Sequence, residues 1–127
     1  MKIIYNDYIP FKGYIAINLF GILFVRGNKT LSKDTINHES IHSEQYKDLF
    51  YILFLILYVL EYLFKIFASI FVNRGKYSIL HYAYKSISLE QEAYYNENND
   101  NYLNVRKRYN WFKYIFKMYK IWNQWKN

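Results

Sequence analysis

Cysteine is absent from this chain of 127 residues, so neither a disulfide framework nor a thiolate metal site can form. Any transition metal that the chain holds must be bound through nitrogen and oxygen atoms. Proline occurs once and glycine four times, and neither occurs between Asn28 and Arg74. Because these residues are the strongest interrupters of regular structure, helices can run through that segment.

Acidic residues are few: 10 Asp and Glu stand against 17 Lys and Arg, a net charge of +7. Such a charge suits an anionic partner, but the joint abundance of Lys, Asn, Ile and Tyr is also what an AT-rich genome produces. No nucleic-acid motif is present, so we expect no nucleic-acid partner. A hydrophobic fraction of 53% excludes a largely disordered chain, and the length predicts a single domain over residues 1–127.

The first residues also lack a secretory signal. Asp7 and Pro10 interrupt the segment 1–11, and no small-residue cleavage site follows the apolar stretch 14–25. We therefore expect a cytoplasmic protein.

Two segments at the N-terminus, 2–9 and 14–25, are rich in Ile, Tyr, Phe, Leu and Val, and the turn residues 10–13 separate them. This pattern predicts two strands joined by a turn. The second strand is apolar on both faces, which predicts a central position in a small sheet, with Gly21 as a bulge.

Helices are expected after residue 31. Ser32 is a predicted N-cap with Asp34 in the first turn, and the helix includes residues 38–42. The segment 49–72 continues it or forms a second helix that ends at 73–76; further helices are expected over 82–96 and 102–125. The predicted fold class is α+β, a small N-terminal hairpin or sheet followed by three to four helices.

The segment 49–72 is almost wholly apolar, and Glu61 and Lys65 are its only charged residues. Its length would cross a bilayer, but two charges in hydrocarbon are costly, and the uninterrupted part 49–60 has the length of a core helix. Three interpretations stay open: the central helix of the domain, partial insertion into a membrane surface, or a true membrane span.

The last predicted helix is amphipathic, with Trp111, Ile115, Met118, Trp122 and Trp125 on one stripe and lysines opposite. This apolar face over 109–125 could dock onto the core, contact an anionic membrane surface or bind a partner. Because aromatic and basic residues occupy separate faces, stacking on single-stranded nucleic acid is disfavoured.

Two of the three histidines fall in the pentapeptide His38-Glu39-Ser40-Ile41-His42. Residues four apart lie on one helix face, so both imidazoles can reach a single ion. Glu39 lies on a neighbouring face, where its carboxylate can act as general base. The pattern predicts a divalent-metal site, zinc by preference.

A tetrahedral catalytic site needs a third protein ligand and one open position. The candidates are His81 and two carboxylates of the third predicted helix, Glu90 and Glu92. Residues two apart on a helix point about 200° apart, so only one of these carboxylates can face the ion.

These elements resemble the zincin superfamily of metallopeptidases, on its gluzincin side, in which a glutamate from a downstream helix completes the site. They resemble more closely a family of small, largely uncharacterised bacterial proteins classed as metallopeptidases. The pattern of that family is His-Glu-x-x-His-x-x-Gln, an aromatic and leucine-rich helix, then Tyr-x-x-x-x-[Phe/Leu]-Glu-x-x-Ala-Tyr. The matching elements here are 38–45, 49–71, and Tyr84 with 89–94.

The resemblance implies a minimal zincin-like domain in which His38, His42 and Glu90 bind Zn2+ and Glu39 is the general base. Its function would be hydrolysis of peptide bonds in a peptide or protein substrate. Alternatives are a metal-binding protein without catalysis, and a membrane-surface protein in which the motif is incidental.

Between the two carboxylates the resemblance favours Glu90, and Glu92 stays open as the alternative. Glu90 stands three residues before Ala93, as the liganding glutamate does in related zincins. Several gluzincins have Asp or Asn four residues after that glutamate to brace a ligand histidine, and this chain has Tyr94. Glu92 does have Asn96 at that spacing.

Five other residues are candidates for supporting roles. Gln45 and Asn37 could hold the ligand histidines by hydrogen bonds, and His81, Tyr82 or Tyr84 could stabilise an oxyanion.

Overall fold

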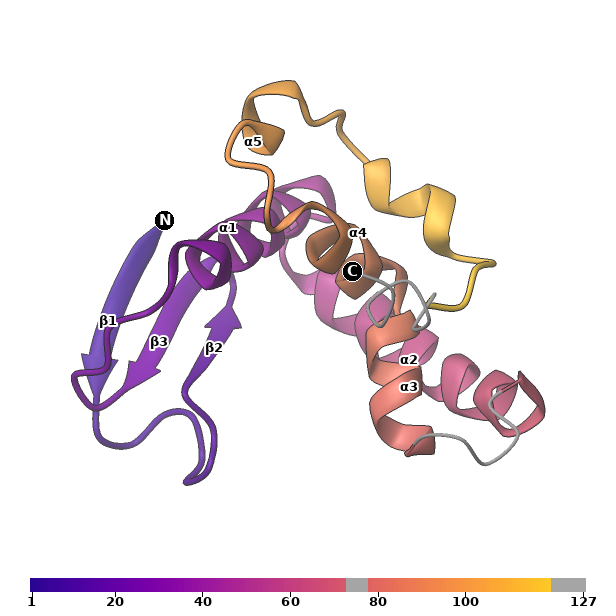
Figure 1. Cartoon of the computed structure of the whole chain (residues 1–127), viewed down its shortest axis with the longest axis horizontal. Coiled ribbons are helices and arrows are strands. Elements are labelled where there is room, and N and C mark those ends of the chain that lie inside the picture. Colours follow the sequence, from indigo (N-terminus) through magenta and orange to yellow (C-terminus); the bar gives the residue numbers. More distant parts are fainter. Residues whose placement is uncertain (73–77, 120–127) are drawn as a thin grey trace.

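A computed structural model describes residues 1–72 and 78–119, and this part of the chain forms a three-stranded sheet, five α-helices and one 3₁₀ helix. Figure 1 shows the sheet on one side, with helix α1 (Lys33–Asp48) packed between it and the remaining helices. The predicted α+β class is confirmed. The helices outnumber the three to four expected, because two predicted helices are each divided.

The segment 14–25 is not one strand. It forms β2 (Ala16–Leu19) and β3 (Ile22–Arg26), joined by a turn in which Phe20 and Gly21 have φ of 55° and 85°. Two successive residues with positive φ make the tight turn that suits a two-residue hairpin. The predicted bulge at Gly21 is therefore wrong. The residue expected to kink a strand instead reverses the chain.

Strand β1 (Lys2–Asn6) does not pair with the strand that follows it. It pairs in parallel with β3, so the strand order is β1-β3-β2 and β3 is central. The predicted turn at residues 10–13 exists, with the Tyr14 N–H donating to the Phe11 carbonyl over 3.1 Å. It directs β2 to the far side of β3 instead of closing a hairpin.

Helix α1 begins as predicted. Ser32 is its N-cap, and the Ser32 hydroxyl accepts a hydrogen bond from the Thr35 N–H. The helix ends at a corner where Phe50 and Tyr51 have φ of 53° and 66°. No glycine marks this corner, so only the structure shows that α2 (Ile52–Val72) is a separate helix.

The predicted helix over 82–96 is two helices, α3 (Ile79–Ser86) and α4 (Ser88–Asn96), because Ile87 between them has extended backbone. Glu61 of α2 reaches this break and accepts hydrogen bonds of 2.6 Å from both the N–H and the hydroxyl of Ser88. A carboxylate at this position caps the helix N-terminus and complements its dipole. The predicted stop at 73–76 lies outside the described residues.

The helix predicted over 102–125 is also wrong in its described part. Only α5 (Tyr102–Val105) and the 3₁₀ helix η1 (Asn110–Tyr114) form there, and Arg106 between them has extended backbone. Trp111 of the predicted stripe packs into the core with Tyr46, Phe54, Ile87 and Leu89. Trp122 and Trp125 lie outside the described residues.

Candidate metal centre

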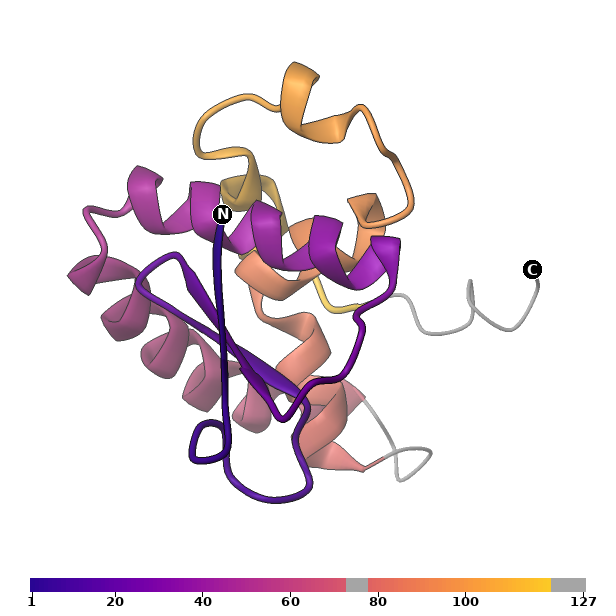
Figure 2. The ribbon, with the colours of Figure 1, turned by 90° about the vertical axis from the view of Figure 1, so that its left-hand side faces the viewer.

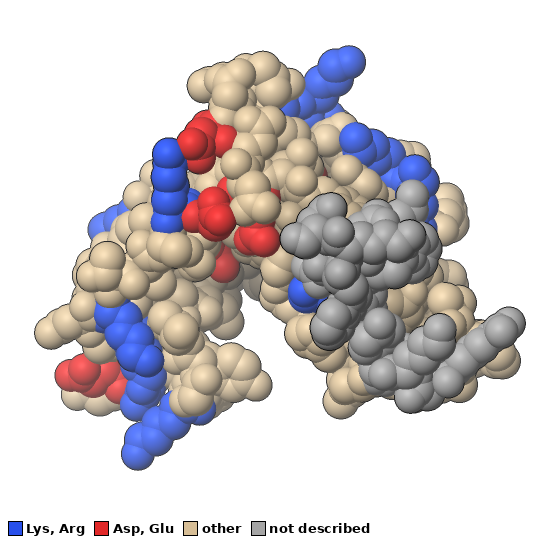
Figure 3. All heavy atoms as spheres, viewed as in Figure 1, with Lys and Arg blue, Asp and Glu red and all other residues tan. Residues whose placement is uncertain are grey.

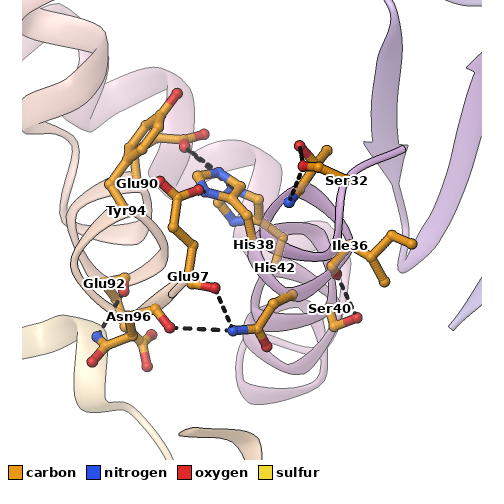
Figure 4. A network of polar contacts seen from close by, with 12 residues as sticks. Ser32, Ile36, His38, Ser40, His42, Glu90, Glu92, Tyr94, Asn96 and Glu97 are labelled. Carbon is orange, nitrogen blue, oxygen red and sulfur yellow. Dashed lines mark hydrogen bonds and ion pairs between the residues drawn. The ribbon is translucent and has the colours of Figure 1, made fainter. Parts of the chain in front are cut away.

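Helix α1 brings two imidazoles to one carboxylate of α4. The Glu90 Oε1 atom lies 3.2 Å from the Nε2 atom of His38 and 3.2 Å from that of His42, and the two Nε2 atoms are 3.1 Å apart. All three residues are buried, with exposed fractions of 6%, 5% and 4% for His38, His42 and Glu90. Figure 4 shows both rings pointing at Glu90.

This triangle has the size of a zinc site. Bonds of about 2.0–2.1 Å in tetrahedral geometry separate neighbouring ligand atoms by about 3.3 Å. The observed separations of 3.1–3.2 Å are close to that value. Among the described residues, His38, His42 and Glu90 are the group of ligand-type side chains close enough to share one ion.

The tautomer of His42 follows from its neighbour Gln45. The Gln45 Nε2 atom donates to the Leu89 carbonyl and to Glu92 Oε1, and both of these atoms can only accept. The amide oxygen of Gln45 must therefore face His42, whose Nδ1 lies 2.7 Å away. That Nδ1 must carry the proton, so in neutral His42 the Nε2 lone pair points at the triangle.

The same logic holds for His38. Its Nδ1 lies 3.2 Å from Glu97 Oε2, an acceptor, so neutral His38 presents its Nε2 lone pair to His42 and Glu90. Asn37 keeps Glu97 in place, since its amide donates to the backbone carbonyls of Asn96, Glu97 and Asn99. Asn37 and Gln45 thus have the positioning contacts that the sequence suggested, Asn37 through the end of α4.

Glu90 has a partner of its own on α2. The Tyr58 hydroxyl donates to Glu90 Oε2 over 2.8 Å, which leaves Oε1 for the histidines. With neutral imidazoles, three lone pairs then converge within hydrogen-bond distance and no proton lies between them. Such an arrangement requires a cation, either protons on the rings or a metal ion.

The pKa values of the three residues also indicate that the cluster attracts positive charge. Burial lowers the pKa of His38, but hydrogen bonds to Glu90 and Glu97 outweigh burial and raise it to about 10. Burial also lowers the pKa of His42, but the charge of Glu90 and the hydrogen bond to it outweigh burial, so the pKa of His42 is raised as well. Burial alone would raise the pKa of Glu90, yet the two histidines hold it well below its usual range. Protons therefore supply the positive charge when no ion is bound.

Glu92 does not face the triangle. Its carboxylate is fully buried and receives hydrogen bonds from Arg106, Tyr102 and Gln45, with the Arg106 Nε only 2.6 Å from Oε2. Asn96 donates to the backbone carbonyl of Glu92 rather than to a histidine. The structure therefore places Glu90 beside the histidines and Glu92 in a structural ion pair.

Glu39 lies between the face of α1 that contacts α4 and the face that contacts the sheet. Its backbone carbonyl accepts from the Asn18 side chain of β2, and its half-buried carboxylate has no hydrogen-bond partner among the described residues. Burial raises the pKa of Glu39. A free carboxylate of raised pKa suits a general base.

The remaining predicted residues lie in different places. His81 is exposed on α3, and Tyr82 packs with Tyr119, so neither joins the triangle. Tyr84 is closer, because its hydroxyl accepts from Tyr94, whose ring lies 4.5 Å from that of His38. Of the three oxyanion candidates, only Tyr84 borders the site.

Glu97 and Tyr58 were not singled out from the sequence. Glu97 stood in a polar turn without a pattern, seven residues after Glu90, where an offset of four was expected. Tyr58 was one of 16 tyrosines. One signal could have identified Tyr58. It carries a polar hydroxyl in an apolar segment and lies on the helix face opposite Ile56 and Leu60.

Comparisons with protein-family models, with curated proteins and with solved structures find no match to this chain.

Proposed function

We propose that this chain is a zinc-dependent peptidase whose ion is held by His38, His42 and Glu90. One observation carries the proposal: three acceptor atoms lie 3.1–3.2 Å apart while Gln45 and Glu97 hold the opposite ring atoms as donors. A buried cluster of this kind binds a cation, and the ligand set of two imidazoles and one carboxylate suits zinc.

A zinc ion in this site would lower the pKa of a water and polarise a carbonyl. The residues around it have distinct tasks. Glu39 takes the proton of the attacking water and passes it to the leaving amine. Tyr58 keeps Glu90 oriented by its 2.8 Å hydrogen bond, and Gln45 and Glu97 keep the two rings in the tautomer that binds.

The sheet offers a place for the substrate. β2 is an edge strand, and its Asn18 side chain bonds both the Glu39 carbonyl and the Ser43 hydroxyl. A peptide that adds to this edge by backbone hydrogen bonds would lie near Glu39. Figure 3 shows the molecule hollowed between the sheet and the helices, with the junction of α1 and α4 at the head of the hollow.

The test has two parts. Protein prepared without chelators should contain about one zinc per chain, and should cleave members of a mixed peptide library in a chelator-sensitive way. Glu39→Gln should keep the zinc and lose cleavage. Glu44→Gln, at a partly exposed position on the same helix paired with Lys47, is the matched control and should keep both. Protein free of zinc, or cleavage unaffected by Glu39→Gln, would contradict the proposal.

The burial of the three ligands favours a second candidate, a zinc site that only stabilises the fold. Two surface hollows among the described residues, one beside the β2–β3 turn and one beside the β1–β2 loop, are lined by none of these three residues. For such a site, zinc would raise the melting temperature, and the Glu39→Gln and Glu44→Gln variants would behave alike in every assay.

A further inference from the structure

Helix α2 has its polar residues on the face that packs against the protein. Glu61 and Lys65, its two charged residues, are 6% and 1% exposed. Glu61 caps α4, as described above, and the Lys65 ammonium donates to the backbone carbonyl of Lys117 over 2.6 Å. Tyr58 on the same face reaches Glu90. The charges that argued against lipid contact are thus bound inside the protein.

The opposite face of α2 is apolar over the whole length of the helix. Every exposed residue of α2 is aliphatic or phenylalanine. Ten of them share one side of the helix and are each at least 49% exposed: Ile52, Leu53, Ile56, Val59, Leu60, Leu63, Phe64, Phe67, Ile70 and Phe71. We call these ten residues the outer face.

The outer face also corrects the interpretation of 49–72 as the central helix of the domain. Only 17% of the most apolar 18-residue window of α2 is buried within the described chain. Figure 2 shows α2 along one edge of the molecule, with α3 on its inner side. A soluble protein rarely leaves an apolar patch of this extent uncovered.

We infer that the outer face of α2 is a membrane-binding surface that inserts into the hydrocarbon boundary of a lipid bilayer. Hydrocarbon suits a face without a single polar side chain, whereas protein interfaces normally include a polar rim. The mean hydropathy of the window, 2.0, lies in the range of bilayer segments. The net charge of +7 favours a bilayer with anionic lipids.

The helix lies along the membrane surface and does not cross it. At 21 residues, α2 is about 31 Å long, enough for the hydrocarbon core. However, its inner face is bonded to α4 and to the backbone of Lys117, just after η1. Lys117 and Lys113 of η1 are both exposed. Crossing would draw these lysines into hydrocarbon, where charged side chains are strongly disfavoured.

Flotation of the full chain with vesicles of phosphatidylcholine and phosphatidylglycerol tests this inference. The triple variant Leu60→Gln, Leu63→Gln, Phe67→Gln should float about tenfold less or worse, since burial of one large apolar side chain already changes partitioning by roughly that factor. The matched control also replaces three exposed large side chains by Gln, but in the β1–β2 loop: Tyr8→Gln, Phe11→Gln, Tyr14→Gln. It should float like the unaltered chain. Equal flotation of both triple variants would overturn the inference.

A second measurement does not depend on disruptive variants. Since the chain has no cysteine, single Cys substitutions at positions 56, 63 and 70 accept an environment-sensitive dye cleanly. On vesicles, quenching by lipid-borne quenchers should give one shallow depth for all three. A deeper middle position would show a span and overturn the surface orientation. If the dyes were shielded from water without lipid, and the chain were a dimer that does not bind vesicles, the outer face would be covered by a second copy of the chain. That result would overturn the inference.

Discussion

Exchanging either carboxylate of α4 for an amide should separate metal binding from folding. Glu90→Gln removes the anionic ligand but leaves no buried charge unpaired, because His38 and His42 can release their protons. Glu92→Gln faces Arg106, whose guanidinium stays charged at any relevant pH. The two changes are chemically identical and lie two residues apart on one helix. Glu90→Gln is expected to lower zinc affinity, and Glu92→Gln is expected to lower the stability of the fold.

The magnitude for Glu92 follows from its contacts. The carboxylate is fully buried, and Arg106 holds both of its oxygens, Nε at 2.6 Å and Nη2 at 3.1 Å. Removing one partner of a buried ion pair costs about 3–5 kcal/mol. Asp48 also binds Arg106, at 2.7 Å, which favours the lower end, about 3 kcal/mol. For a domain of this size that is a fall in melting temperature of roughly 10 °C.

For Glu90 the loss should appear in zinc affinity. It should exceed the roughly 10–100-fold that loss of an outer hydrogen-bond partner costs, because a ligand itself is removed. Zinc content after dialysis and thermal unfolding in chelator, followed by circular dichroism, measure the two effects separately. If Glu92→Gln lost zinc while Glu90→Gln kept it, or if both kept one zinc per chain, the assignment of the site would be refuted.

Three further predictions follow from the same geometry. Glu97→Ala should lower zinc affinity about 10–100-fold without changing the fold, measured by competition with a chelating dye; unchanged affinity would contradict the positioning of His38. Zinc affinity should rise between about pH 6 and 8, because the ion displaces a proton that His38 holds with a pKa of about 10. In chelator the sign is opposite: protonated His38 stabilises the fold fully below its ordinary pKa of about 6.5, and this contribution is lost as the pH rises toward 10, so the melting temperature should fall. A peptide tethered to vesicles should be cleaved faster than the same peptide free in solution, because Tyr58 places the site about one helix diameter, ~10 Å, from the outer face; equal rates would contradict this.

Local sequence signals were sufficient where the deciding contacts are local. The cap at Ser32 and the i, i+4 spacing of His38 and His42 depend only on neighbours within two helical turns, and both are present as predicted. The turn at Phe20–Gly21 was interpreted as a bulge and the corner at Phe50–Tyr51 was missed. Phe20, Phe50 and Tyr51 are bulky residues, which seldom adopt positive φ and so do not indicate a turn.

Long-range partners divided the remaining helices. The break at Ile87 is stabilised by Glu61 from α2, and the chain after α5 is drawn to Glu92 and Asp48 through Arg106. Neither contact changes the apolar periodicity of the sequence near Ile87 or Arg106, so the sequence gives no sign of either break. Continuous helices over 82–96 and 102–125 were therefore the expected reading of an apolar pattern that the tertiary structure interrupts.

The sequence alone determined that any transition metal here must use nitrogen and oxygen ligands, because the chain has no cysteine. It also determined that His38 and His42 share one helix face, because they stand four residues apart. The resemblance favoured Glu90 over Glu92, but helical spacing alone could not show which of the two carboxylates faces the histidines. Only the packing of α4 on α1 turned Glu90 to the histidines and Glu92 to Arg106. Tertiary structure likewise decided that α2 buries its charges and exposes its apolar side, because only partners across the fold could neutralise Glu61 and Lys65.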